Sequence, residues 1–237
     1  MFELSKDSML HGFLPSLIEG AGVTLSVALA SLAMAMILGL LGALAKLSKW
    51  RFARGLAHLY TTLIRGVPDL VLMLLIFYGG QVAVNSIALS LGHEEYIDIN
   101  PYVAGVLTIG FIFGAYLTEA FRGAFLAVPP GQREAGLAYG MSGWQIARRI
   151  TFPQMFRHAL PGLSNNWLVL IKSTAIVSVI GLHDLMTRGQ QAAGSTREPF
   201  VFYLAVALIY LAFTSVSELL FDRLQKRFST GVRRGSL

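Results

Sequence analysis

The sequence has no cysteine and few charged residues. Without cysteine the chain can form neither disulfides nor thiolate metal sites. Charged residues make up 14% of the 237 residues, whereas soluble domains usually carry about 25%. The phosphate-binding pattern G-x-x-x-x-G-K-[ST] is also missing, as is any recognisable set of catalytic nucleophiles. We therefore expect a chain that is not an enzyme and that holds no metal or cofactor of its own.

The shortage of charge is concentrated in long apolar stretches. Glu19 and Lys46 bracket one stretch without charged side chains, and Asp98 and Glu119 bracket another. Each is long enough to cross roughly 30 Å of hydrocarbon, which takes about 20 helical residues. Backbone polar groups must be satisfied internally in lipid, and an open chain achieves this as helices. The sequence predicts an all-α, polytopic membrane protein.

Five membrane-spanning helices are expected in a single transmembrane domain covering residues 1–237, with a cytoplasmic loop at about 123–158. The predicted spans are 18–45, 56–80, 100–122, 159–182 and 200–221.

The second span can be placed in two frames. One runs from Leu70 to Gly92 and leaves Asp69 at the cytoplasmic surface. We prefer 56–80, because Gly79-Gly80 followed by polar residues is typical of a helix exit. This frame places Arg65 and Asp69 at membrane depth, where a charge is costly unless it pairs or faces water.

Basic residues indicate the orientation of the chain. The second loop, about 81–99, has no Lys or Arg, whereas the first loop, the third loop and the C-terminal tail are basic. By the positive-inside rule these basic segments are cytoplasmic, so the N-terminus lies outside and the C-terminus in the cytoplasm. The basic residues concerned are Lys46, Lys49, Arg51 and Arg54; Arg122, Arg133, Arg148, Arg149 and Arg157; and Arg223, Lys226, Arg227, Arg233 and Arg234.

The third loop is predicted to hold a short helix between helix breakers. The run from Pro129 to Gly131 ends the third span, Gly140 allows a sharp bend, and Pro153 starts a new helix. Between them, Leu137, Met141 and Trp144 occur at helix-like spacing and would form an apolar ridge unless Gly140 interrupts it. Such a ridge suits insertion into the groove of a partner or adsorption on the membrane surface.

This loop resembles the EAA loop of ABC importer permeases. The resemblance rests on Glu134, Ala135, Gly140, Ile150 and Pro153. The third motif position is a glycine, where the family commonly has alanine. The resemblance implies a type I ABC importer permease fold, in which this loop is a coupling helix seated in a cleft of a cytoplasmic ATPase. The residues expected to serve this coupling are Glu134, Ala135, Gly136, Gly140, Met141, Trp144 and Pro153.

The resemblance extends over nearly the whole chain. Residues 60–70, 116–124, 160–167 and 172–175 are similar to signatures of polar amino acid permeases. The chain is similar to the Q-type permeases of histidine/lysine/arginine/ornithine importers, with opine and arginine/ornithine permeases as near relatives. This implies a subunit of the bacterial cytoplasmic (inner) membrane that forms half of the pathway of an ATP-driven, binding-protein-dependent importer of cationic amino acids. The implied partners are a second homologous permease subunit (giving a heterodimer), two ATPase subunits that bind ATP and Mg²⁺, and a periplasmic or extracellular solute-binding protein.

Two acidic residues within spans are candidates for the substrate path. Asp69 would attract a cationic side chain strongly in a low-dielectric cavity. It could equally pair with Arg65, four residues earlier on the same predicted helix, and the two roles can coexist. Glu119 matches a family-typical Glu, which favours a shared structural role over specificity.

The fourth span contributes three more candidates, Asn165, Asn166 and Lys172. The amides would form hydrogen bonds between helices or line the path. Lys172 would face the path or pair with Glu119.

Two other functions remain open. The permease could carry another polar amino acid or an opine, and the sequence does not say which amino acid is preferred or whether the two permease subunits are identical. From a different class, the chain could be an autonomous secondary carrier or channel, although it lacks the internal repeat typical of such proteins.

Overall fold

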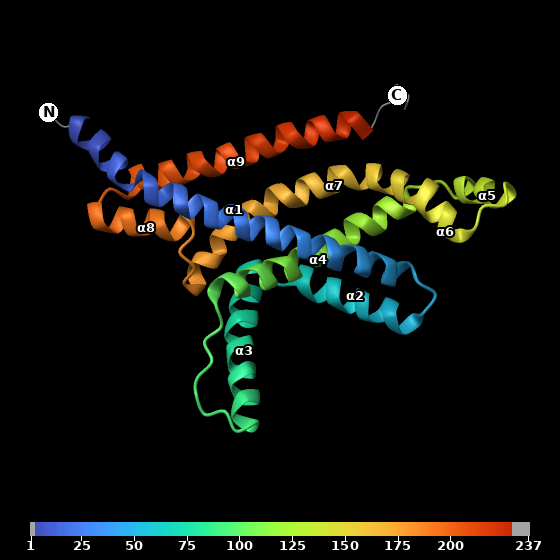
Figure 1. Ribbon diagram of the computed structural model, residues 1–237, viewed down its shortest axis with the longest axis horizontal. Coiled ribbons are helices and arrows are strands. Elements are labelled where there is room, and N and C mark those ends of the chain that lie inside the picture. The colour runs from blue at the N-terminus through green and yellow to red at the C-terminus, as the bar shows by residue number, and fades with distance from the viewer. Residues whose placement is uncertain (1–2, 229–237) are drawn as a thin grey trace.

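The computed structural model describes residues 3–228, and all regular structure in this range is helical. Within it, five helical segments are long and apolar enough to cross a membrane by length and composition. The long helices α1, α4, α7 and α9 run lengthwise, and α3 stands across them (Figure 1). The elements are α1 (Glu3–Leu47), α2 (Arg51–Gly66), α3 (Asp69–Ser90), α4 (Pro101–Leu126), α5 (Pro130–Ala138), α6 (Gly143–Ile146), the π-helical turn η1 (Ala147–Thr151), α7 (Phe152–Ser173), the 3₁₀ segment η2 (Thr174–Ile180), α8 (Leu185–Thr196) and α9 (Pro199–Phe228).

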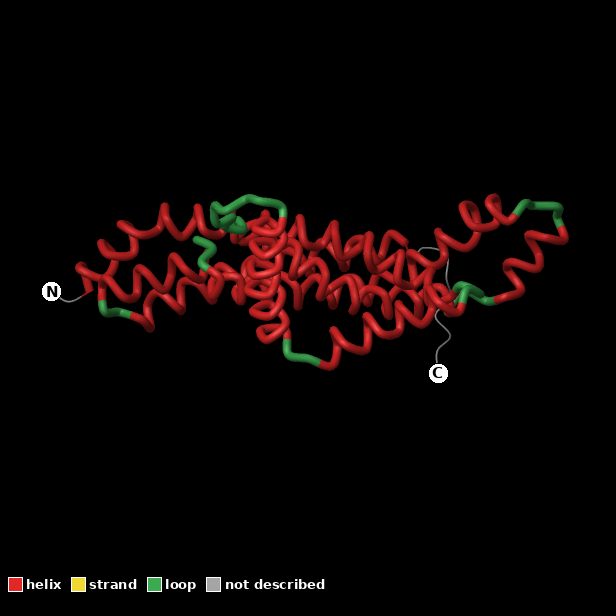
Figure 2. Tube along the Cα trace, turned by 90° about the horizontal axis from the view of Figure 1, so that it is seen from below, coloured by secondary structure: helices red, strands yellow, loops and turns green. Residues whose placement is uncertain are grey.

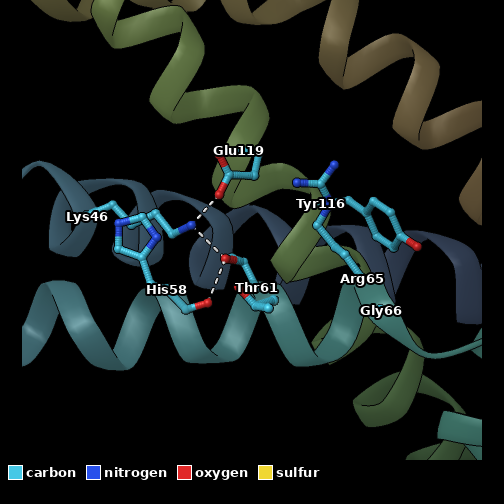
Figure 3. Close-up of a pocket in the computed structure, with 8 residues that line it drawn as sticks. Lys46, His58, Thr61, Arg65, Gly66, Tyr116 and Glu119 are labelled. Carbon is cyan, nitrogen blue, oxygen red and sulfur yellow. Dashed lines mark hydrogen bonds and ion pairs between the residues drawn. The ribbon is translucent and has the colours of Figure 1, made fainter.

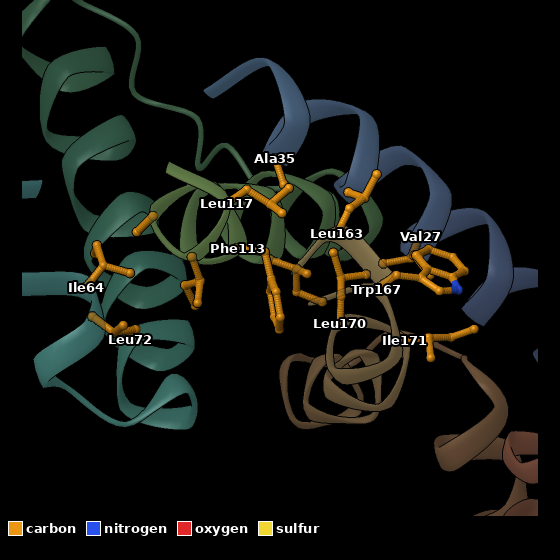
Figure 4. Close-up of a cluster of buried hydrophobic side chains, with 14 of the residues drawn as sticks. Val27, Ala35, Ile64, Leu72, Phe113, Leu117, Leu163, Trp167, Leu170 and Ile171 are labelled. Atoms are coloured by element: carbon orange, nitrogen blue, oxygen red, sulfur yellow. The ribbon is translucent and has the colours of Figure 1, made fainter. Parts of the chain in front are cut away.

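Helix α4 is the centre of the core. Of its apolar stretch 61% is buried within the chain, against 17% for α9, so α9 is left open to lipid or to a partner. Figure 4 shows Phe113 and Leu117 of α4 among side chains of α1 and α7, including Val27 and Leu170. Burial of these side chains packs α1 and α7 against the central helix α4.

Small residues bring α1 and α4 into close contact. A Cβ atom added at Gly39 would lie 2.6 Å from the Cβ atom of Leu117. One added at Gly110 would lie 2.8 Å from the sulfur atom of Met34. Glycine at such positions lets two backbones approach closely, which is how helices commonly associate in lipid.

The prediction of one helix over 56–80 is wrong. The chain breaks between α2 and α3 at Val67 and Pro68, and the apolar helix is α3, as in the frame that we did not prefer. Proline pushes the residue before it towards extended backbone, and Val67 has φ −118° and ψ 140°. The steric effect of Pro68 therefore outweighs the apolar character of its neighbours.

The polar residues that resembled a helix exit have another role. Gly79 and Gly80 lie inside α3, and glycine is well tolerated in membrane helices. The side chain of Asn85 donates to the carbonyl oxygen of Ile97 (2.9 Å) and accepts from its N–H (2.8 Å). The Gln81 side chain accepts from the N–H of Ile99 at 3.0 Å. These amides hold the extended segment before α4 against α3.

Other helices extend beyond the predicted spans. Helix α1 begins near the N-terminus rather than at residue 18, and α9 continues to Phe228. The helical run containing α7 begins at Gly143. Helix α8, in the fourth loop, was not predicted. Apolar composition marks the depth of hydrocarbon, whereas a helix continues into water until a cap or breaker ends it.

The basic segments gather at one end of the molecule. The α1–α2 turn, the α5–α6 region and the end of α9 lie towards one end, and α8 lies at the other with the start of α1 (Figures 1 and 2). This arrangement agrees with the prediction that the basic segments share one side of the membrane. Arg233 and Arg234 of the predicted tail lie outside the described residues.

Candidate functional site

A charged pocket of about 470 Å³ lies between α1, α2 and α4 (Figure 3). Its volume falls within the range of about 300–1,000 Å³ usual for small-molecule sites. Most of its lining comes from the second half of α2, because that helix presents polar side chains at helical spacing towards α4. The lining residues are Lys46, His58, Thr61, Thr62, Arg65, Gly66, Tyr116 and Glu119.

One wall of the pocket is a buried ion pair. Lys46 is in the last turn of α1, and its side chain is 3% exposed. Its Nζ atom pairs with the Glu119 carboxylate and donates a hydrogen bond to Thr61 Oγ1 at 2.6 Å. The Nε atom of Arg122 donates to the other Glu119 oxygen at 2.9 Å. Two cations therefore neutralise Glu119, which favours a structural role. The alternative that Lys172 pairs with Glu119 is wrong in this structure.

The opposite wall carries Arg65. The predicted Arg65–Asp69 pair on one helix face is wrong, because the break at Pro68 places these residues on different helices, and no ion pair joins them in the described structure. The guanidinium carbon of Arg65 instead lies 5.7 Å from the ring centroid of Tyr116. The Tyr116 hydroxyl lies close to the Asp69 carboxylate. Tyr116 thus stands between a cation and an anion that do not neutralise each other.

The fourth-span candidates lie away from this pocket. The Asn166 side chain donates to the carbonyl oxygen of Gly162 at 2.8 Å, within its own helix, so the expected bond between helices is absent for this side chain. Asn165 is exposed on the same helix, and Lys172 is exposed in its last turn. The pocket therefore brings together Arg65 and Glu119, with Asp69 adjacent. The three candidates from the fourth span lie outside it.

The third loop folds as a helical hairpin. Helix α4 ends before Pro129, and α5 begins at Pro130, as the breakers predict. Glu134 and Ala135 are exposed on α5, whereas Gly136 is buried. A Cβ atom at Gly136 would lie 2.9 Å from Ile146 Cγ1, so the glycine lets α5 pack directly on α6.

Gly140 interrupts the possible ridge, which is the alternative that the sequence left open. Helix α5 ends at Ala138, and Gly140 turns the chain with a φ of +73°, a conformation that favours glycine. Ser142 then starts α6 with a capping box, in which its N–H donates to the Gln145 side chain at 2.8 Å. The side chains of Leu137, Tyr139 and Trp144 are nevertheless 53%, 89% and 71% exposed, while Met141 is half-buried. Pro153 lies in the first turn of α7, as expected, although η1 joins that turn to α6 without a gap.

From the sequence, Lys46 was used only to predict the orientation of the chain, and neither Thr61 nor Tyr116 was predicted to belong to the site. One signal was available for Lys46. It follows an uncharged stretch directly, just as Glu119 ends another, and this pattern allows the two opposite charges to lie at similar depth. Thr61 and Tyr116 carry no comparable signal, because helix packing alone brings them to the pocket.

Comparisons with known proteins agree with one another. A family described as "Binding-protein-dependent transport system inner membrane component" matches residues 35–230. The chain is 54% identical over 229 residues to the histidine/lysine/arginine/ornithine transport system permease protein HisQ of Salmonella typhimurium, covering 97% of this chain and 100% of the relative. It is 39% identical over 233 residues to the octopine transport system permease protein OccQ of Rhizobium radiobacter, covering 96% and 98%.

A solved structure shows the same fold. The crystal structure of an amino acid ABC transporter with histidines matches with a TM-score of 0.78 and 31% identity, over 92% of this chain and 96% of that one. The chain is thus a multi-pass protein of the bacterial inner membrane and a transport component rather than a catalyst. The alternative of an autonomous carrier or channel loses its support. The chain belongs to the family of binding-protein-dependent transport system inner membrane components, as a permease subunit of an amino acid ABC importer.

Proposed function

We propose that this permease imports cationic amino acids, namely histidine, arginine, lysine and ornithine. The observation that carries the proposal is the unneutralised pair of charges on either side of Tyr116. Arg65 and Asp69 make no ion pair within the described residues. Arg65 and Tyr116 line one pocket of suitable size, and Asp69 lies next to Tyr116. The relative named for these four amino acids, 54% identical to this chain, supports the same substrate class.

The chemistry of such a substrate fits these charges. A cationic amino acid carries an α-carboxylate at one end and a positive side chain at the other. The fork of an arginine guanidinium matches a carboxylate, so Arg65 would bind the α-carboxylate. Asp69 would bind the cationic side chain, and the face of the Tyr116 ring adds a cation–π surface. Attraction at membrane depth is several times stronger than in bulk water, so each charge contributes to selection.

Replacement of Asp69 tests the substrate class. In vesicles holding the assembled importer and its binding protein, arginine should compete for histidine uptake more strongly than glutamine does. Asp69→Asn should lower uptake of cationic amino acids about tenfold, which corresponds to losing about 1.4 kcal/mol of charge attraction. Asp222→Asn is the matched control, because Asp222 is an exposed acid on α9. Equal competition by glutamine, or normal uptake by Asp69→Asn, would favour the alternative of another polar amino acid or an opine.

We also infer that the α5–α6 hairpin couples this chain to a separate ATPase. Three large apolar side chains, Leu137, Tyr139 and Trp144, are exposed on the hairpin at the basic end of the molecule. An exposed apolar cluster of this kind suits a groove on a partner protein. ATP and Mg²⁺ would bind that partner, and its closure would move the hairpin and rock the attached spans.

The remaining assembly is inferred from what this chain leaves incomplete. Helices α3 and α9 are the least buried of the candidate spans, at 22% and 17%. A transport pathway usually needs two halves around a midplane site, so a second, homologous permease subunit would face this one, forming a heterodimer. Two ATPase subunits and an extracytoplasmic solute-binding protein complete the importer, and the chain forms one transmembrane domain with its N-terminus outside.

A further inference from the structure

A second hollow, which we call the elbow groove, lies between α1 and α2 on a different face of α2 from the charged pocket. Its volume is about 440 Å³. The Tyr60 hydroxyl donates its hydrogen bond to the carbonyl oxygen of Phe111, so the groove offers a ligand an apolar lining. The lining residues are Leu38, Leu41, Gly42, Ala45, Ala53, Leu56, Ala57, Tyr60 and Phe111.

The groove has the length and openness of a site for a hydrocarbon chain. Between Ala45 and Leu38 it follows α1 for about 10 Å, at roughly 1.5 Å per residue. Small side chains at Ala45 and Ala53 keep its upper part wide. Leu41 and Leu56 on its two rims are 59% and 58% exposed, so the groove opens to the surface of the bundle.

Cations surround the turn at the top of the groove. Lys49, Arg51 and Arg54 are exposed and form no ion pair in the described structure. No acidic residue occurs anywhere from residue 20 to residue 68. The turn therefore holds a local excess of positive charge that only a group from outside this segment can neutralise.

Exposed aromatic rings lie between the cations and the apolar surface. Trp50 and Phe52 are 67% and 68% exposed, and their ring centroids are 5.6 Å apart. Phe52, Leu59 and Leu63 recur at helical spacing along one exposed flank of α2. Amphipathic rings are enriched at the level of lipid headgroups, and an exposed apolar flank beside them suits contact with acyl chains.

We propose that the elbow groove is a binding site for an anionic phospholipid. One acyl chain occupies the groove, and the phosphate lies among Lys49, Arg51 and Arg54. The order from cations through aromatic rings to an apolar channel repeats the layers of one bilayer leaflet. A protein partner would have to match all three layers at once, whereas a phospholipid does so by its own structure. The proposal is independent of which solute the permease carries.

Native mass spectrometry of the assembled transporter tests this site. The complex is released from detergent after exposure to phosphatidylglycerol or to phosphatidylcholine with the same acyl chains. The native complex should retain phosphatidylglycerol preferentially. Combined Lys49→Gln, Arg51→Gln and Arg54→Gln should lower that retention up to roughly a hundredfold, because each basic residue near a charged membrane surface contributes about fivefold. Ala53→Phe fills the groove and should lower retention of both lipids without changing any charge.

The matched control removes three charges from the same end of the molecule. Arg148→Gln, Arg149→Gln and Arg223→Gln together should leave retention of phosphatidylglycerol unchanged. If the first triple variant fails to assemble, Ala53→Phe decides, because it keeps every cation. Equal retention of the two lipids, normal retention by Ala53→Phe, or photo-crosslinking from position 41 to the second permease subunit instead of lipid would overturn the proposal.

Discussion

At the scale of single residues, the buried cation Lys46 connects three helices. It pairs with Glu119 of α4 and donates to Thr61 of α2 from the last turn of α1. Removing one partner of a buried pair is costly because the other charge is left without compensation. Replacing both with apolar residues of similar size is often nearly neutral. Lys46 therefore matters for stability in addition to lining the charged pocket.

Replacing Lys46 should reveal this role. Lys46→Met should lower the free energy of unfolding by about 2 kcal/mol, less than the roughly 3–5 kcal/mol of a fully buried pair, because Arg122 still contacts Glu119. The double variant Lys46→Met with Glu119→Leu should recover most of the loss. Denaturation of the purified protein in detergent measures both, with exposed Lys49→Met as the control. A single variant as stable as the native chain would show that the pair contributes nothing.

Asp184 is a second buried charge outside the candidate spans. It caps α8, and its Oδ1 atom accepts a hydrogen bond from the N–H of Thr187 at 2.9 Å. Its Oδ2 atom is buried and has no hydrogen-bond partner in the described structure. Burial raises the pKa of the Asp184 carboxyl, and the hydrogen bonds from Thr187 only partly oppose this. Ionised Asp184 therefore weakens the fold at neutral pH.

The pH dependence of stability follows from the raised pKa of the Asp184 carboxyl. A carboxyl whose pKa is raised by folding stabilises the protein below its unfolded pKa of about 3.9, and this contribution is lost as pH rises through the folded pKa. Asparagine caps helices about as well as aspartate and carries no charge. Asp184→Asn should therefore raise the melting temperature at about pH 8, with the difference shrinking towards about pH 4. Asp184→Ala, which loses the cap, should lower it. A pH-independent difference for the Asn variant would contradict this account.

At the scale of elements, the α5–α6 hairpin depends on glycine geometry. Gly140 has φ +73°, which an L-residue adopts at a cost of about 1–2 kcal/mol. Glu134 is exposed on α5, away from the packing contact of Gly136 with Ile146. Gly140 thus sets the shape of the hairpin, and Glu134 is available to a partner.

Changes in the hairpin should separate transport from ATP hydrolysis. Gly140→Ala distorts the turn and Glu134→Ala removes an exposed contact, so both should lower uptake while leaving membrane insertion intact. Uptake, ATP hydrolysis and co-purification of the ATPase are measured on the same preparations. Gly131→Ala is the control, because a Cβ atom there meets nothing within 4 Å. Normal uptake in both variants would remove the hairpin from the coupling mechanism.

At the scale of the whole molecule, the basic segments lie at one end and α8 at the other. The excess of Lys and Arg favours the cytoplasm for the basic end. The hairpin that would meet the ATPase lies at that same end, so charge and function favour the same orientation. Helix α8 would then face the solute-binding protein.

The absence of cysteine makes this orientation easy to test. Single variants Ala138→Cys on α5 and Gln190→Cys on α8 place one thiol at each end, both at exposed positions. A membrane-impermeant maleimide should label Gln190→Cys in intact cells and Ala138→Cys only after the membrane is opened. The native chain, which has no thiol, is the control. The reverse pattern would invert the orientation.

Local chemistry was sufficient to predict much of this protein. Apolar stretches identified the membrane class, and the breakers around Pro130 and Gly140 located the hairpin, because composition and backbone preference act over a few residues. The break at Pro68 was also a local signal, but Gly79-Gly80 and the polar residues after them were given more weight as a helix exit. Gln81 and Asn85 were misread for a different reason, since their partners lie in a segment that only folding brings near.

Contacts across helices could not be read from residue order. Glycines at Gly39 and Gly110 bring α1 against α4, and that approach carries Lys46 to Glu119. The turn at Pro68 separates Arg65 from Asp69, and packing of α4 then places Tyr116 between them. Such pairs join segments far apart in the chain, and the energy that selects them comes from burial and close packing of whole helix faces. The residue types and their spacing within a single element therefore do not predict which of these pairs form.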